Sequence, residues 1–186
     1  MMWDLPTSIE IDGVSYKIRN NCDFRVVLDC IIALNDNELT EQEKIYCALF
    51  IFYEDFEEMQ NKVNIEIAIK EMFKIINYGE EQEQEQEKKP KLMDWEHDFN
   101  LLVAPINRVL GYEIRGVKWI HWYTFLGAYY EIGECTFANV VSIRSKKAKG
   151  KKLEKWEQDF YRENKKMVDL PQNLTEEEQE WLDSDW

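Results

Sequence analysis

The chain has 186 residues, of which 45% are hydrophobic and 13% are aromatic. This length and composition indicate a folded protein with a substantial core and argue against an intrinsically disordered chain. The formal net charge of −14 argues against a general nucleic-acid-binding protein, because most of the surface would repel phosphate.

The N-terminal region predicts a β-hairpin. Ile9 and Ile11 alternate with polar neighbours, and Asp12-Gly13 is a favoured two-residue turn. The same alternation resumes after the turn, at Val14, Tyr16 and Ile18. One hairpin cannot bury its own apolar face, so we expect it to pack on helices.

Three amphipathic helices are predicted after the hairpin. The first begins at Asp23, and the second is opened by Thr40 and Glu43, which form a capping box. The third runs from Asn64 to Gly79. Isoleucines alternate at the start of this third segment, as in a strand, but its length and its glycine end favour a helix.

Residues 80–91 separate two halves of similar size. The stretch EEQEQEQEKKPK contains no hydrophobic residue, so it predicts a mobile linker, with a solvent-exposed helix ending before Pro90 as the alternative. We therefore divide the chain into four parts: a hairpin with helices (1–79), the linker (80–91), a helical half (92–170) and an acidic tail (171–186).

The C-terminal half is predicted to be entirely helical. Asp94 caps a helix that Gly111 closes, and Thr136 caps a later one. Between them, Val117–Glu131 is apolar nearly all round, which is typical of a helix surrounded by others. The whole chain therefore predicts a mainly α-helical bundle with one small N-terminal β-hairpin.

The four cysteines form no Cys-x-x-Cys pair, and each lies in or beside an apolar helical pattern, as buried free thiols often do. With no signal peptide at the start, we expect a reducing intracellular setting. The longest hydrophobic run, Ile45–Tyr53, is far shorter than the ~20 residues that a bilayer requires. We expect no membrane partner.

Catalytic and metal sites have little support. The two histidines, His97 and His121, lie in no metalloprotease motif, and no glycine-rich phosphate loop occurs. Asp94, Glu96, His97 and Asp98 are close in sequence, but adjacent residues of a helix point in diverging directions. They fit a solvated helix start whose acids favour the helix dipole. We expect no enzymatic activity, no cofactor and no bound metal.

Seven positive charges lie in the basic run Arg144–Lys155. One interpretation is a nucleic-acid-binding patch. The other is a solvated helix or a strip that pairs with the acidic tail. No aromatic residue suited to base stacking occurs before Trp156, and the overall charge has the opposite sign, so we favour the second interpretation.

An aromatic surface is the main candidate site. Trp119 and Trp122 are three residues apart and share a predicted helix face with Tyr123. Core packing is the alternative, but so small a domain cannot easily bury every flank, and large exposed apolar patches usually mark an interface. The candidate partner-binding residues are Trp119, Trp122, Tyr123, Phe125, Tyr129, Phe137 and Val141. In the tail, Trp181 and Trp186 either anchor in a groove or stay exposed.

The following pieces occur in order between Leu5 and Lys155: LPTSIEIDGVSYKI, DFRVVLDCI, an acidic linker, DWEHDFNLLVAPINRVLGYEIR, WIHWYTFLGAYYEI and TFANVVSIRSKK. This order resembles a phage protein family called gene product fifteen, whose members look like tail assembly chaperones of long-tailed phages. The resemblance implies that the protein binds the tape measure protein in the host cell cytoplasm and leaves before the virion matures.

That role is compatible with the composition. A tape measure protein is a long helical chain with apolar faces, so its chaperone needs apolar grooves and high solubility but no chemistry. Further partners that we consider are the tail tube protein, a host antiphage defence protein and a second copy of the chain. The alternative function is a virion structural component, such as a head–tail connector or tail-completion protein, which forms a closed ring. A more distant alternative is a small regulator that binds nucleic acid through the basic run.

Overall fold

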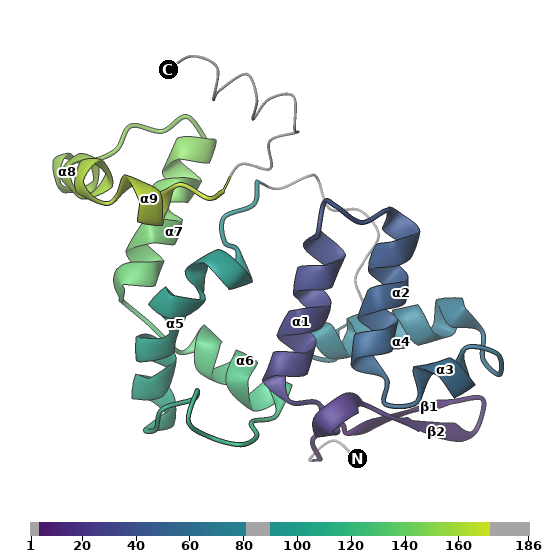
Figure 1. Ribbon diagram of the computed structural model, residues 1–186. Coiled ribbons are helices and arrows are strands. Elements are labelled where there is room, and N and C mark those ends of the chain that lie inside the picture. The colour runs from purple at the N-terminus through teal and green to yellow at the C-terminus, as the bar shows by residue number, and fades with distance from the viewer. Residues whose placement is uncertain (1–3, 81–89, 172–186) are drawn as a thin grey trace.

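The computed structural model describes residues 4–80 and 90–171 (Figure 1). Over these residues the chain is mainly helical with a two-stranded antiparallel hairpin at its N-terminus, which confirms the predicted fold class. The elements are β1 (Ser8–Ile11), β2 (Val14–Lys17), the 3-10 turn η1 (Arg19–Asn21), α1 (Phe24–Asn35), α2 (Glu41–Phe52), α3 (Phe56–Met59), α4 (Ile65–Ile76), α5 (Trp95–Leu110), α6 (Trp122–Tyr130), α7 (Thr136–Ala148), α8 (Lys155–Glu163) and α9 (Lys165–Val168).

The hairpin turn has the residues that its geometry requires. Asp12 and Gly13 occupy its two central positions with φ angles of 52° and 78°. A two-residue turn with both φ angles positive favours Asp-Gly, because glycine adopts this region without steric cost. Ile9 and Ile11 are buried, and β1 packs against α4. The hairpin is therefore anchored to the helices by its apolar face.

Most of the predicted helix starts are confirmed by capping hydrogen bonds. The side chain of Asp23 caps α1, and those of Asn64 and Asp94 cap α4 and α5. Thr40 and Glu43 form the reciprocal capping box of α2. These side chains accept hydrogen bonds from amides that lack a partner in the first helical turn, which is why they define the starts so well.

Two features of the C-terminal half differ from prediction. The helix expected over Val117–Glu131 begins only at Trp122, because His121 is its N-cap. Thr136 is the first residue of α7, and Cys135 occupies the N-cap without a side-chain capping hydrogen bond. The end of α5 at Gly111, with φ of 79°, is as predicted.

The segment before α6 is extended because it pairs with the start of α1. The amide of Phe24 donates to the carbonyl of Ile120 at 2.9 Å, and the amide of Trp122 donates to the carbonyl of Cys22 at 2.8 Å. The carboxylate of Asp23 accepts from the amide of Ile120 at 2.9 Å. These long-range bonds replace the helical hydrogen bonds that the local sequence would otherwise make.

One hydrophobic core includes residues from both sides of the 80–91 segment. Phe24 of α1 stacks on Phe125 of α6, with ring centroids 4.4 Å apart. Trp95, the first residue of α5, lies 6.1 Å from Trp122. As Figure 1 shows, α1 lies between α2 on one side and α5 with α6 on the other.

A second, smaller apolar cluster lies between α7 and the C-terminal helices α8 and α9. Arg144 links this cluster to α5, because its guanidinium forms a bidentate ion pair with Asp98 at 2.6 and 2.8 Å. The same guanidinium donates to the carbonyls of Leu92, Met167 and Val168. Arg144 therefore joins α7, α5, α9 and the chain just before α5.

Two lysines of the same basic run also pair with acids, Lys146 with Glu157 at 2.7 Å and Lys147 with Asp169 at 2.6 Å. Hydrogen bonding to Lys146 lowers the pKa of the buried Glu157 carboxyl. These contacts support a structural interpretation of the first part of the run. No helix in the described ranges combines the length and hydrophobicity needed to cross a membrane.

Candidate functional site

The seven residues of the predicted aromatic surface do not form one surface. Trp119 is 46% exposed, whereas Trp122, Phe125 and Phe137 are buried and Tyr123, Tyr129 and Val141 are partly buried. Trp119 precedes α6, so it does not share a helix face with Trp122, and its indole N–H donates to the carbonyl of Asn20 at 2.9 Å. The buried side chains offer no surface in this conformation. Trp181 and Trp186 lie outside the described residues, so their role as anchors stays a prediction.

The aromatic residues of α6 instead support a groove next to them. Phe125 stacks on Phe24, and Trp122 and Tyr129 pack around Trp95 with ring centroids 6.1 and 5.1 Å away. Phe24 and Trp95 both line a cavity between α1 and α5. The predicted residues are thus brought together by the fold, but mainly as the wall behind this cavity.

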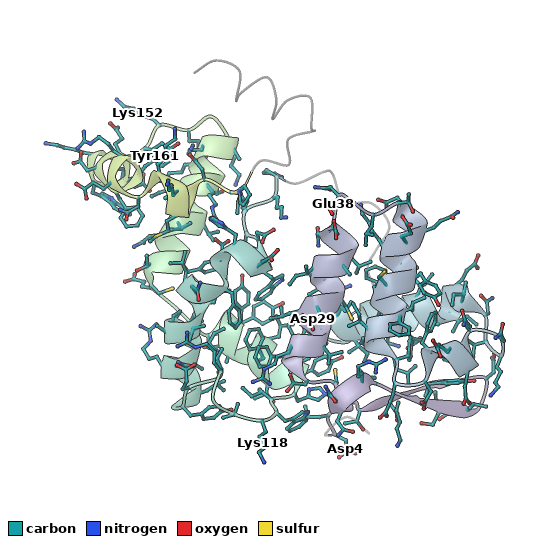
Figure 2. The ribbon with its side chains drawn as sticks, viewed as in Figure 1. Asp4, Asp29, Glu38, Lys118, Lys152 and Tyr161 are labelled. Carbon is teal, nitrogen blue, oxygen red and sulfur yellow. The ribbon has the colours of Figure 1, made fainter. Side chains whose placement is uncertain are left out.

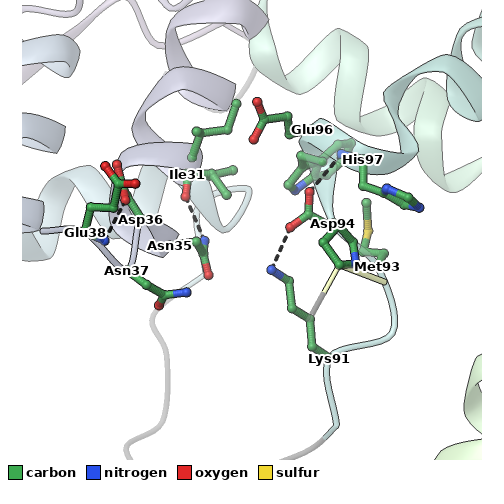
Figure 3. A pocket seen from close by; sticks show the side chains of 13 residues that line it. Ile31, Asn35, Asp36, Asn37, Glu38, Lys91, Met93, Asp94, Glu96 and His97 are labelled. Carbon is green, nitrogen blue, oxygen red and sulfur yellow. Dashed lines mark hydrogen bonds and ion pairs between the residues drawn. The ribbon is translucent and has the colours of Figure 1, made fainter. Parts of the chain in front are cut away.

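Two adjoining cavities form what we call the α1–α5 groove. They have volumes of about 350 and about 1130 Å³ and share Ile32, Trp95 and Glu96. The apolar residues that line them come from α1, the segment just before α5, the start of α5 and the chain after α9: Phe24, Leu28, Ile31, Ile32, Met93, Trp95, Phe99 and Pro171. The larger cavity is also lined by polar side chains, among them Asn35, Asp36 and His97. Figure 3 shows the larger cavity, with the end of α1 facing the segment that contains Lys91 and Asp94.

Among the residues that the structure describes, every cation that lines the groove is already paired. The pairs are Lys91 with Asp94 at 2.7 Å, Arg115 with Glu113 at 2.8 Å and Arg25 with Asp23 at 3.1 Å. By contrast, Asp29, Glu38 and Glu96 have no cation partner among the described residues, and they lie on both walls of the groove. Burial raises the pKa of the Asp29 carboxyl, because no positive charge offsets its partial desolvation.

An exposed aromatic residue that sequence reasoning missed is Tyr78. Its ring lies 4.6 Å from that of Tyr123 and 6.4 Å from that of Tyr130. The backbone of Tyr78 has a φ of 62°, a conformation that is uncommon for a bulky residue. Nothing in the local sequence except the following Gly79 signals this turn, which directs the ring onto α6.

The sequence did not identify the groove residues as a candidate binding site, because their spacing is typical of core residues. Phe24, Leu28 and Ile31 recur at helical spacing and form an apolar stripe of the amphipathic helix predicted from Asp23, and the sequence does not show that part of this stripe faces a cavity. The one available signal is Ile32, which lies off that stripe and is 37% exposed. An apolar residue beside the core stripe widens the face that a partner can contact.

Chemistry at the described residues is limited. No group of three or more His, Cys, Asp or Glu is placed to hold a metal ion within residues 4–80 and 90–171. The carboxylate of Asp98 is engaged by Arg144 and receives the amide of Asp94. Burial raises the pKa of the Cys22 thiol to about 12 and also raises that of Cys30. These two thiols are therefore protonated near neutral pH and are not activated nucleophiles.

Comparison with known proteins agrees with the resemblance seen in the sequence. A protein-family model described as "Bacteriophage Gp15 protein" matches residues 2–170. No curated protein and no solved structure matches the chain. The family match covers both sides of the 80–91 segment and includes all residues of the α1–α5 groove except Pro171. The chain belongs to the Bacteriophage Gp15 protein family.

Proposed function

We propose that this protein is a phage tail assembly chaperone that binds a helical segment of the tape measure protein in the α1–α5 groove and keeps it soluble in the host cytoplasm. The observation that carries the proposal is the groove itself, an open depression whose smaller cavity is lined mainly by apolar side chains of α1 and α5 and whose larger cavity adds polar and charged side chains around Ile31, Ile32, Met93 and Trp95. An amphipathic helix that lays its apolar face into such a groove is a recurrent mode of recognition.

The packing behind the groove supports this proposal. Trp95 rests on Trp122, Phe125 and Tyr129, and Phe24 rests on Phe125. These contacts hold the lining side chains in place before a partner arrives. A preformed site loses less conformational entropy on binding than a mobile one, so more of the apolar contact contributes to affinity.

The function is tested by co-expressing this chain with the tape measure protein of the same phage. The expected result is a soluble complex that forms only when this chain is present and that pull-down recovers. A tape measure protein that stays insoluble and unbound would contradict the proposal. Mass spectrometry of purified virions tests the alternative, because a chaperone is expected to be absent from them and a connector or tail-completion protein to be retained.

The site is tested by a matched pair of substitutions. Ile32→Asp puts a charge into the groove, whereas Ile67→Asp puts the same charge on α4, outside the residues that line it. The two isoleucines are 37% and 38% exposed, so the two changes differ mainly in location. We expect Ile32→Asp to weaken tape measure binding at least about tenfold, corresponding to a loss of about 1.4 kcal/mol. We expect Ile67→Asp to bind like the parent.

Circular dichroism and thermal melting of both variants show whether each still folds. Equal binding by the Ile32→Asp variant and the parent would mean that the partner binds elsewhere. A third cavity, of about 460 Å³ between α2 and α4, is the next site to test. Tyr46→Asp changes an exposed residue that lines it.

A further inference from the structure

We propose that the α1–α5 groove selects a cationic amphipathic helix, in which lysine or arginine residues flank the apolar stripe that enters the groove. This inference rests on the proposed function, because it specifies the charge of the partner segment that binds in the groove. It commits to one kind of partner and excludes acidic and uncharged helices.

The charges on the two walls carry the inference. Asp29 on α1 and Glu96 on α5 both line the smaller cavity, and Glu38 lies at the edge of the larger one (Figures 2 and 3). None of these three carboxylates has a cation partner among the described residues. The neighbouring Lys91 and Arg115 do not compensate them, because each already forms an ion pair of 2.7 to 2.8 Å.

The unpaired carboxylates are placed beside the apolar anchors of the groove. Asp29 lies three residues before Ile32 on the same helix, and Glu96 directly follows Trp95. A helix that covers Ile32 and Trp95 must therefore remove water from the two acids as well. Desolvating a carboxylate is costly unless a cation replaces the lost water, so a lysine or arginine beside the apolar stripe repays this cost.

Charge also separates this partner from two other occupants. The segment 172–186 follows Pro171, which lines the larger cavity, but it carries six acids. A second copy of the chain has a formal net charge of −14. Both would bring negative charge to a groove at which Arg25, Lys91 and Arg115 are already paired, and like charges at an interface disfavour association.

The inference is tested with two synthetic 18-residue peptides that have the same apolar stripe. Lysines occupy the flanking positions in one peptide, and glutamates occupy them in the other. Fluorescence anisotropy with the full chain is expected to show at least about tenfold tighter binding of the lysine peptide. This preference should decrease as salt is added, because the charges remain close to solvent. Equal affinities for the two peptides would overturn the inference.

A negatively charged protein attracts any cationic peptide, so the location of the charge needs its own control. The variant D29K/E96K reverses one charge on each wall of the groove. The variant E10K/E66K makes the same change of formal charge on β1 and α4. Glu66 and Glu96 are each the second residue of their helix, so both variants lose one acid from a first helical turn. Circular dichroism confirms the fold of each variant.

We expect D29K/E96K to weaken binding of the lysine peptide about tenfold and E10K/E66K to change it by less than about threefold. Equal losses in the two variants would show that overall charge attracts the peptide, and the inference would be wrong. A labelled peptide with the sequence of residues 172–186 is expected not to bind. If that peptide binds, or if the chain self-associates, and Ile32→Asp abolishes this binding, the groove takes a different occupant and the inference is wrong.

The outcomes for the two proposals remain distinguishable. If the tape measure protein is bound and solubilised equally well by the parent and D29K/E96K, the chaperone function stands and the charge preference fails. If the lysine peptide binds the groove with the expected charge dependence but the tape measure protein is not bound, the groove chemistry stands and the proposed function fails.

Discussion

The ion pair between Asp98 and Arg144 is the interaction whose loss we expect to have the largest structural effect. The two side chains are 0% and 5% exposed, and two charge-assisted hydrogen bonds of 2.6 and 2.8 Å connect them. The perturbation is Arg144→Met, which keeps much of the length of the side chain but removes its charge and all its donors. Asp98 then stays buried with one remaining donor, the amide of Asp94.

The expected loss of stability follows from the carboxylate of Asp98, which remains buried without its ion-pair partner. Removing one partner of a buried ion pair typically costs about 3–5 kcal/mol, because the other charge remains away from water. Arg144 also donates to the carbonyls of Leu92, Met167 and Val168, which lose these hydrogen bonds in the variant. For a chain of this size, such a loss corresponds to a decrease in melting temperature of roughly 6–20 °C.

The assay is urea-induced unfolding of the parent, of Arg144→Met, of Asp98→Leu and of the double variant. We expect the double variant to be more stable than the sum of the single losses predicts, because it leaves no uncompensated charge, with a coupling of about 0.5–3 kcal/mol. Additive losses, or a cost below about 1 kcal/mol for Arg144→Met, would refute the reasoning.

The same substitution also tests the proposed binding groove, because the ion pair holds one wall of it in place. Arg144 binds the carbonyl of Leu92, and Asp98 binds the amide of Asp94. In the short segment from Leu92 to Asp94, Met93 and Asp94 line the larger cavity. We therefore expect Arg144→Met to weaken partner binding even below its melting temperature, measured in the same pull-down as the groove variants.

Two further predictions concern the start of α6. The Nδ1 atom of the buried His121 accepts a hydrogen bond from the amide of Tyr123, and burial lowers the pKa of the imidazole. Below about pH 6.5 the unfolded chain therefore binds a proton that the folded chain does not, so the stability should fall as the pH decreases. His121→Asn keeps a capping acceptor but does not titrate, so denaturation between pH 7.5 and 5 should show a smaller pH dependence in this variant than in the parent. An equal pH dependence would contradict this assignment. Trp122→Ala should cost about 3–5 kcal/mol of stability because the ring is buried, whereas the exposed Trp119→Ala should cost much less, measured by thermal melting.

Local sequence signals predicted the hairpin turn, the starts of α1, α2, α4 and α5 and the end of α5, because these signals depend on nearby atoms. Thr40 and Glu43 are three residues apart, so their capping box forms whatever the rest of the chain does. The Asp12-Gly13 turn and the helix end at Gly111 depend in the same way on the φ angles that these residues adopt without strain. Such signals need no knowledge of tertiary structure.

The aromatic segment shows where local reasoning failed. Helical periodicity placed Trp119 and Trp122 on one face, but the strand-like pairing with Cys22 and Phe24 keeps residues before His121 out of the helix. The partners in this pairing are about a hundred residues apart in sequence. Core packing was the alternative for both tryptophans, and a window of local sequence cannot contain the competition that exposes Trp119 and buries Trp122.

The helical class, the hairpin, several helix caps and the family can be predicted from sequence, because propensity, capping and motif order are encoded in short stretches of chain. Which apolar faces meet and which remain open depends instead on how distant segments pack. Trp95 has a spacing typical of a core residue, yet it is only partly buried and lines a groove beside α1, whereas Phe24 at the base of the same groove is buried. The pairing of Arg144 with Asp98 was decided in the same way, since burial and charge compensation depend on which distant segments the fold brings into contact.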